Sequence, residues 1–198
     1  PIYLIEHHIA EKVIALDIGN VCIGIHPERC FGALGFRSLA DIPREVLFLA
    51  GERFERGEIS EAEFLDGFRR LTGSALSDAE LRRAFCAIIG EPVPGMAELV
   101  SGLAGRGYRP VFFSDTSVTH MEELRRKFPA ASAVPDGIYS YRVHAKKPEL
   151  PMFEAFEARF GVPAFYFDDR AELIEGARKH GWNAHRFVSA EEVDKILG

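Results

Sequence analysis

The chain has 198 residues, of which 47% are hydrophobic and 16 are phenylalanine, so it can bury the core of one domain or of one domain with an inserted subdomain. Its formal net charge is −6 and it contains no run of basic residues, which argues against nucleic acid and anionic membrane surfaces as partners. No apolar stretch approaches transmembrane length, and residues 1–10 lack the pattern of a signal peptide. Cys22, Cys30 and Cys86 are scattered without a close pair, as expected of reduced core thiols in a soluble, cytoplasmic protein.

Three short apolar runs, each of strand length, end at polar side chains. The runs and the residues that end them are 13–16 with Asp17, 111–113 with Ser114, and 165–167 with Asp168 and Asp169. Fully apolar runs of this length are typical of central strands in a parallel sheet, because helices cover both of its faces. Ligands bind such sheets outside the carboxyl ends of the strands, so we expect these polar groups to lie together at one edge.

Between residues 25 and 91, helical patterns replace strand patterns. Residues 43–56 carry apolar side chains at the spacing of one buried helix face. Two capping boxes begin further helices at Ser60 and Ser77, each with a glutamate three residues later. We therefore expect a helical cap subdomain at 25–91, inserted into a core formed by residues 1–24 and 92–198.

Strand and helix patterns alternate after residue 92. The expected elements are helices at 96–104, 118–128, 152–160 and 171–180, strands at 111–113, 137–143, 165–167 and 184–188, and a last helix that begins with a capping box at Ser189. This alternation predicts an α/β fold with a doubly wound parallel sheet. Residues 2–9 fit either an added edge strand or a loose terminus.

The polar groups at the strand ends carry an excess of negative charge. Asp17, Asp168 and Asp169 would repel one another at one sheet edge unless positive charge offsets them. Lys147 supplies one such charge, and Mg²⁺, which prefers oxygen ligands, is the expected second. Any one of these residues alone would more often be a helix cap, a turn or a solvated charge, so the prediction depends on their combination. Such a site suits phosphoryl transfer, with an aspartate as nucleophile and with Ser114 and Lys147 on the phosphoryl group.

The order of these residues resembles the motifs of the haloacid dehalogenase-like (HAD) hydrolase superfamily along nearly the whole chain. The four matching segments are Leu16–Val21, Phe113–Thr116, Lys147–Glu149 and Phe167–Arg170. The helical insertion after the first motif resembles the family's small α-helical cap, and Gly57–Ser60 is similar to caps of its sugar-phosphate phosphatases.

This resemblance implies a role for each motif residue. Asp17 would be the nucleophile and a metal ligand, Ser114, Asp115 and Lys147 would form the phosphate-binding group, and Asp168, Asp169 and the Gly19 carbonyl would complete the Mg²⁺ site.

Two residues depart from the commonest form of these motifs. Most family phosphatases carry a second aspartate, the general acid and base, where this chain has Gly19. A branch with Asp-x-Gly-Asn-Val motifs, resembling glucose-1-phosphate phosphatases, shares the glycine. The second departure is Asp115, where relatives often carry asparagine. Its carboxylate must point away from the phosphate, be protonated, or replace the missing acid.

We predict a Mg²⁺-dependent phosphatase of small phosphomonoesters, with sugar phosphates among the candidates and a small phosphorylated metabolite as partner. Alternatives are a catalytically weak or inactive phosphate- or partner-binding protein, which Gly19 motivates, and a 2-haloacid dehalogenase, which the Asp168–Asp169 pair argues against. A receiver domain is excluded because its acidic pair comes first in the chain. Candidate substrate contacts in the cap are Arg29, Arg44, Arg53 and Arg56. The sequence indicates no oligomeric state.

Overall fold

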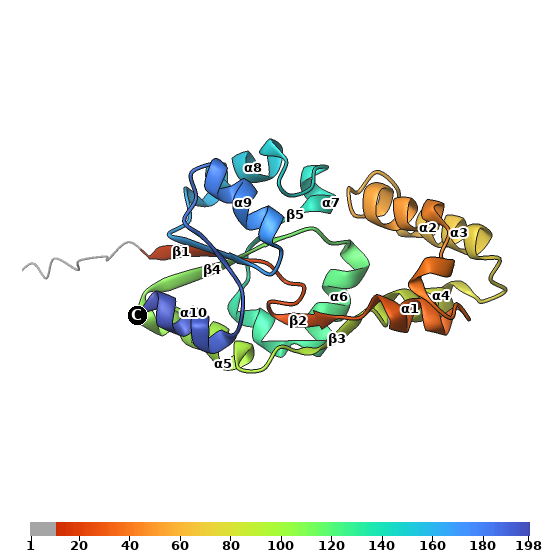
Figure 1. Ribbon diagram of the computed structural model, residues 1–198, viewed down its shortest axis with the longest axis horizontal. Coiled ribbons are helices and arrows are strands. Elements are labelled where there is room, and N and C mark those ends of the chain that lie inside the picture. The colour runs from red at the N-terminus through yellow and green to blue at the C-terminus, as the bar shows by residue number, and fades with distance from the viewer. Residues whose placement is uncertain (1–10) are drawn as a thin grey trace, which may run out of the picture.

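The computed structural model describes residues 11–198, in two parts (Figure 1). One part is a parallel sheet of five strands in the order β5-β4-β1-β6-β7, covered by helices. The strands are β1 (Lys12–Leu16), β4 (Tyr108–Ser114), β5 (Gly137–Tyr139), β6 (Phe165–Asp168) and β7 (Ala184–Arg186). The predicted doubly wound α/β fold is confirmed, and the segment 2–9 lies outside the described residues.

The order in which the chain adds strands to the sheet reverses at β1. From this central strand the chain places β4 and β5 on one side and β6 and β7 on the other. Leu16 pairs with Phe112 of β4 and with Phe167 of β6, so the three strands end within two residues of one another. A reversal of strand order at this point is where open α/β sheets form their ligand crevices.

Two apolar layers cover the sheet because side chains alternate along each strand. Ile14 and Leu16 face the layer built with α5 (Met96–Gly102), α6 (Val118–Lys127) and α10 (Ala190–Leu197). Ala15 between them faces the layer built with α8 (Leu150–Phe160) and α9 (Ala171–Lys179). Figure 1 shows these helix groups on opposite faces of the sheet. The core strands are therefore apolar on both faces, as their sequences predict.

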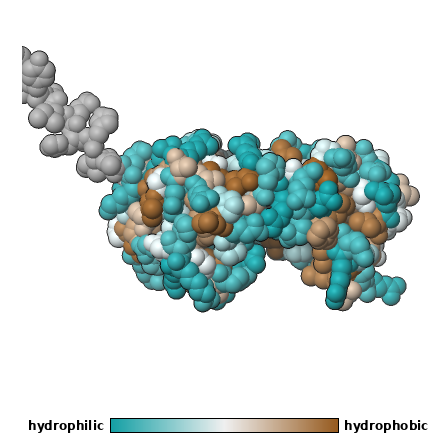
Figure 2. All heavy atoms as spheres, turned by 90° about the horizontal axis from the view of Figure 1, so that it is seen from above, coloured by the Kyte–Doolittle hydropathy of each residue, from teal (hydrophilic) through white to brown (hydrophobic). Residues whose placement is uncertain are grey.

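The second part is a helical lobe, residues 26–88. It contains α1 (Pro27–Ala33), α2 (Arg44–Phe48), α3 (Glu61–Thr72) and α4 (Asp78–Cys86), with a π-helical segment, Leu49–Phe54, after α2. The lobe has its own apolar core, in which Phe64 stacks on Phe54 with ring centroids 4.4 Å apart. Both predicted capping boxes form, at Ser60 and Ser77. Figure 2 shows the lobe standing beside the sheet as a distinct body.

Several element boundaries differ from the sequence prediction. The chain enters and leaves the helical lobe through β2 (Ile23–Ile25) and β3 (Ile89–Pro92), an antiparallel pair that the prediction missed because both strands are very short. The strand predicted at 137–143 ends at Tyr139, and α7 (Ser140–Val143) follows it. The helix predicted at 96–104 ends at Gly102, and that predicted at 43–56 changes from α to π geometry at Leu49.

Three further predictions concern the start of α10, the cysteines and membrane-spanning helices. At the start of α10 only half of the predicted capping box forms, since the Ser189 hydroxyl accepts the Glu192 amide without a return bond among the described contacts. Cys22, Cys30 and Cys86 are buried free thiols. Among residues 11–198, none of the helices is both long and apolar enough to cross a membrane.

Candidate active site

The three predicted strand ends meet beside Lys147. Asp17 directly follows β1, while Ser114 and Asp168 are the last residues of the neighbouring strands β4 and β6. Lys147 arrives from the loop between α7 and α8. All four are buried. The parallel topology thus brings together groups that are far apart in the sequence.

The ammonium group of Lys147 is the centre of this cluster. Its Nζ donates to Asp17 Oδ1 at 2.9 Å, to Asp168 Oδ2 at 2.6 Å and to the Phe113 carbonyl at 3.0 Å. An ammonium has three donors, and all three are used. Burial by itself lowers the pKa of Lys147, but the nearby carboxylates raise it well above its usual value. These contacts therefore hold Lys147 in its charged form.

Burial has the opposite effect on the nucleophile candidate, Asp17. Loss of water raises the pKa of the Asp17 carboxyl to about 7, a shift that Lys147 opposes and Asp168 reinforces. Asp168 itself is held by two further groups: the Tyr166 hydroxyl donates to its Oδ2 at 2.5 Å, and the Arg170 amide donates to its Oδ1 at 3.0 Å. These bonds fix Asp168 with one oxygen toward Lys147.

Three carboxylates form a group that could hold a metal ion. One oxygen each of Asp17, Asp168 and Asp169 lies within 4.8 Å of the others. Asn20 orients Asp169, because its Nδ2 donates to Asp169 Oδ2 at 3.2 Å while its Oδ1 accepts the Ile25 amide at 3.0 Å. An all-oxygen donor set with two or three carboxylates and open positions fits Mg²⁺.

A pocket of about 260 Å³ opens beside these groups. Its lining includes Asp17, Gly19, Ser114 and Asp169 of the α/β part, and Glu55 and Ile88 of the helical lobe. The other lining residues are Ile18, Asn20, Ile25, Ile89, Asp115, Thr116, His120, Met121, Leu124, Lys146, Lys147, Arg170 and Leu173. The pocket can hold a small ligand with one polar end against Asp17 and Lys147.

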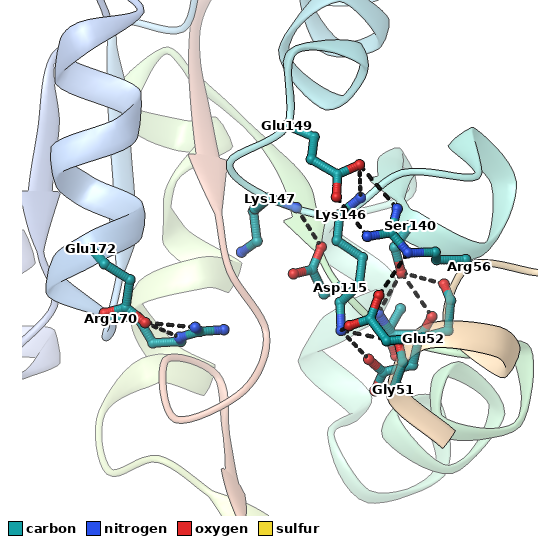
Figure 3. Close-up of polar contacts among 12 residues, drawn as sticks. Gly51, Glu52, Arg56, Asp115, Ser140, Lys146, Lys147, Glu149, Arg170 and Glu172 are labelled. Atoms are coloured by element: carbon teal, nitrogen blue, oxygen red, sulfur yellow. Dashed lines mark hydrogen bonds and ion pairs between the residues drawn. The ribbon is translucent and has the colours of Figure 1, made fainter. Parts of the chain in front are cut away.

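Asp115 points one oxygen away from the centre of this site. Its Oδ1 accepts the backbone amide of Lys147 at 3.0 Å, so the side chain supports the loop that delivers the lysine (Figure 3). Burial raises the pKa of Asp115, while Lys147 lowers it. Ser114 next to it is buried and has only a long 3.5 Å contact with a carbonyl, which leaves its hydroxyl available to a ligand.

The structure also identifies site residues that the sequence prediction missed. Asn20 and Tyr166 orient Asp169 and Asp168, and Glu55, Lys146 and Arg170 line the pocket. One signal was present for Tyr166, because the spacing of two along a strand places it on the same face as Asp168. Lys146 is held at the pocket by the helical lobe, since its Nζ donates to Glu55 Oε2 at 3.0 Å.

The four cap arginines predicted as substrate contacts do not line this pocket. Three of them form ion pairs with the protein's own carboxylates: Arg29 with Glu91, Arg53 with Glu58, and Arg56 with Glu52 and Glu149. Neither the pocket lining nor these ion pairs support the predicted substrate contacts.

Comparison of the chain with family models and with curated proteins finds no match. Solved structures do match. A HAD family enzyme from Bacteroides thetaiotaomicron has a TM-score of 0.81 at 22% identity, with 96% of this chain and 99% of that chain covered. The same enzyme in complex with magnesium and inorganic phosphate gives 0.77 at 24% identity, covering 90% and 95%. This chain has the HAD fold.

Two further structures with this fold differ in their similarity to the chain. A predicted HAD-like family hydrolase from Porphyromonas gingivalis has a TM-score of 0.78 at 19% identity, with 95% of this chain and 98% of that chain covered. The L-2-haloacid dehalogenase of Xanthobacter autotrophicus gives 0.65 at 13% identity, covering 94% and 82%. The backbone is therefore closer to the first two proteins than to the dehalogenase.

Because the Asp17 carboxyl is buried, we predict that Asp17→Asn stabilises the metal-free protein, and that the increase in stability depends on pH. The pKa of Asp17 is about 7 in the folded protein and 3.8 for the unperturbed group. Between about pH 4 and pH 7 the carboxyl therefore ionises in the unfolded chain but not in the folded one, and the wild-type protein loses stability as the pH rises. The neutral amide avoids this loss. Calorimetry in a chelator should show a rise in Tm for the variant that is larger at pH 8 than at pH 5.

The matched control is Asp66→Asn, since the Asp66 side chain is 63% exposed. It should change Tm little at either pH. A variant at Asp17 that is no more stable than wild type at pH 8 would contradict the cost assigned to this buried carboxylate.

Proposed function

We propose that the protein is a Mg²⁺-dependent phosphatase that hydrolyses small phosphomonoesters through an aspartyl-phosphate on Asp17. The observation that carries the proposal is the convergence of Asp17, Ser114, Lys147, Asp168 and Asp169 at one pocket on the switch point of a HAD fold. It is supported by the complex of a similar HAD family enzyme with magnesium and inorganic phosphate.

The proposed metal site consists of Asp17, Asp168, Asp169 and the carbonyl of Gly19. When bound there, Mg²⁺ would neutralise charge on the phosphoryl group during transfer. The charges agree with a divalent cation: three carboxylates and the Lys147 ammonium leave two negative charges uncompensated.

The chain's own residues supply the covalent step. An Asp17 oxygen attacks phosphorus, and the bond from phosphorus to the ester oxygen breaks, with the electron pair leaving on that oxygen. Water then attacks the phosphorus of the aspartyl-phosphate, which releases inorganic phosphate and regenerates the Asp17 carboxylate. Lys147 holds Asp17 in place through its 2.9 Å contact and offers positive charge to the transferring group, and the Ser114 hydroxyl donates to a phosphoryl oxygen.

The pocket favours a small substrate. Its volume of about 260 Å³ suits a phosphorylated metabolite, with sugar phosphates among the candidates, and does not suit a polymer. We propose that residues 25–91 act as a cap, because Glu55 and Ile88 of the helical lobe form one side of the pocket wall. The substrate's alcohol part would lie against this side.

A second candidate function is phosphate binding with weak or no catalysis, because Gly19 has no acid side chain. A Cβ at this position would lie 3.0 Å from Ile25 Cγ1, so the loop is packed for glycine and places no acid there. A dehalogenase function is less well supported, since the group formed by Asp17, Asp168 and Asp169 suits a metal ion, which halide displacement does not need.

A screen of phosphate esters with and without Mg²⁺ tests the function. We expect turnover of p-nitrophenyl phosphate that requires Mg²⁺, and no release of halide from 2-haloacids. Asp17→Asn should reduce turnover to background, because the amide is not a nucleophile, while Asp66→Asn should retain full activity. Halide release, or ester hydrolysis unaffected by chelator, would overturn the proposal.

Gly19 predicts which esters react fastest. Without a general acid the departing oxygen carries its own charge, and the lost catalysis is worth about 10²- to 10⁴-fold. Rates should therefore fall steeply from p-nitrophenyl phosphate to alkyl esters such as glycerol phosphate. Gly19→Asp should flatten this dependence, provided that Ile25 shifts by a few tenths of an ångström.

Equal rates for aryl and alkyl esters in wild type would show that another acid acts at the leaving group. Asp115 and Glu55 are the pocket carboxylic acids to test in that case, because both line it and burial raises the pKa of each.

A further inference from the structure

Residues 51–57 of the helical lobe dock onto the loop that carries Lys147. This docked segment includes the end of the π-helix, and it faces residues 140–149 of the α/β part (Figure 3). The approach is close, because a Cβ on Gly57 would lie 2.2 Å from the Tyr141 carbonyl oxygen. Gly57 has φ +66°, and only glycine combines that conformation with that contact readily.

Side chains tie the two segments at three further points. The Lys146 ammonium donates to Glu55 Oε2 at 3.0 Å and to the Gly51 carbonyl at 3.1 Å. The Ser140 hydroxyl lies 2.6 Å from the Glu55 carbonyl, and the His144 Nδ1 lies 2.8 Å from the carbonyl of Arg56.

The strongest tie is the Arg56–Glu149 ion pair. Arg56 donates to both carboxylate oxygens, from Nη1 at 2.9 Å and from Nη2 at 2.5 Å, while its Nε donates to Glu52 Oε2 at 2.9 Å. The Arg56 side chain is only 20% exposed. A two-pronged, partly buried pair of this kind fixes geometry as well as contributing energy.

Glu149 connects this pair to the catalytic lysine. The Lys146 amide donates to its Oε2 at 3.3 Å, and its own amide donates to the Lys146 carbonyl at 2.7 Å. Glu149 is also the residue that precedes α8, yet its side chain accepts no amide of that helix. The carboxylate is thus committed to Arg56 and to the turn that contains Lys147.

We propose that Arg56 is a positioning residue for the phosphatase reaction, acting through Glu149 to hold the Lys147 loop in its catalytic place. The inference rests on the proposed function. The path is short: Arg56 holds Glu149, Glu149 holds the turn at Lys146, and Lys147 in that turn reaches Asp17 and Asp168. The helical lobe therefore contributes to the placement of Lys147 as well as to the wall of the pocket.

A second contact between the same two parts provides the control. Arg82 of α4 pairs with Glu122 of α6 and with Glu61 of α3, and the Thr119 hydroxyl donates to Glu61 at 2.6 Å. This contact also joins the helical lobe to the α/β part, but it lies on α6, and none of the hydrogen bonds described for residues 11–198 joins it to the Lys147 turn. Arg82→Gln removes an ion pair of the same type without disturbing the lysine.

The experiment compares Arg56→Gln, Glu149→Gln, their double variant and Arg82→Gln, using p-nitrophenyl phosphate with Mg²⁺. We expect Arg56→Gln to lower kcat by ~10- to 100-fold, the size of effect seen when a catalytic group is displaced by about an ångström. Glu149→Gln should lower kcat similarly, and the double variant should be no worse than either single one, since the residues act as a pair. Arg82→Gln should leave kcat near wild type.

Calorimetry separates positioning from general damage. Arg56→Gln should weaken binding of inorganic phosphate in the presence of Mg²⁺, because the proposed phosphate site depends on where the Lys147 charge is placed, while Arg82→Gln should leave that binding unchanged. Arg56→Lys, which keeps the charge and the fold but loses the two-pronged geometry, should fall between Arg56→Gln and wild type.

Two results would overturn the inference. One is equal kcat losses in Arg56→Gln and Arg82→Gln, and the other is additive losses in the Arg56–Glu149 double variant. Normal turnover by wild type together with either result refutes the positioning role alone. Absence of Mg²⁺-dependent turnover in wild type refutes the proposed function, and the inference falls with it.

Discussion

The site depends on one buried ammonium group. Lys147 lies between Asp17 and Asp168 with all of its donors used, and it offsets part of the repulsion among three carboxylates. Removing one partner of a buried ion pair costs about 3–5 kcal/mol in other proteins, because the remaining charge is left without compensation. Here the compensation is incomplete: burial raises the pKa of Asp17 to about 7, Asp168 adds to the rise, and Lys147 offsets only part of it. A divalent cation would complete the charge compensation and favour the ionised, nucleophilic form of Asp17. Metal binding and ionisation of the nucleophile are therefore linked in the proposed phosphatase.

The elements around Lys147 explain how this arrangement is held. Strands β1, β4 and β6 end within two residues of one another, so the parallel sheet fixes Asp17, Ser114 and Asp168. Lys147 has no strand to fix it and arrives on a loop. Asp115 holds that loop from the sheet side through the Lys147 amide, and Arg56 holds it from the helical lobe through Glu149. The loop is thus supported on two sides, by Asp115 within the pocket wall and by Arg56 outside it.

The sequence predicts what depends on local pattern and misses what depends on long-range contact. Apolar strands ending at Asp17, Ser114 and Asp168 have a local signature, and the capping boxes at Ser60 and Ser77 do too. The partners of Arg56 and Lys146 have none, because Glu149 and Glu55 lie 93 and 91 positions away from them. The short strands β2 and β3 are stabilised by pairing with each other rather than by the strand propensity of their residues. The change from strand to helix after Tyr139 also has no signature in the local sequence.

The most direct test of the central claim is to identify the residue that carries the phosphoryl group. Wild-type protein mixed with p-nitrophenyl phosphate and Mg²⁺ would be quenched in acid, digested and analysed by mass spectrometry. Because Gly19 offers no side chain to activate water, the aspartyl-phosphate should accumulate enough to be detected. We predict one phosphoryl group on the peptide that contains Asp17, dependent on Mg²⁺ and absent from Asp17→Asn. Hydrolysis that proceeds with no phosphorylated peptide, or with the phosphoryl group on another residue, would contradict the role of Asp17.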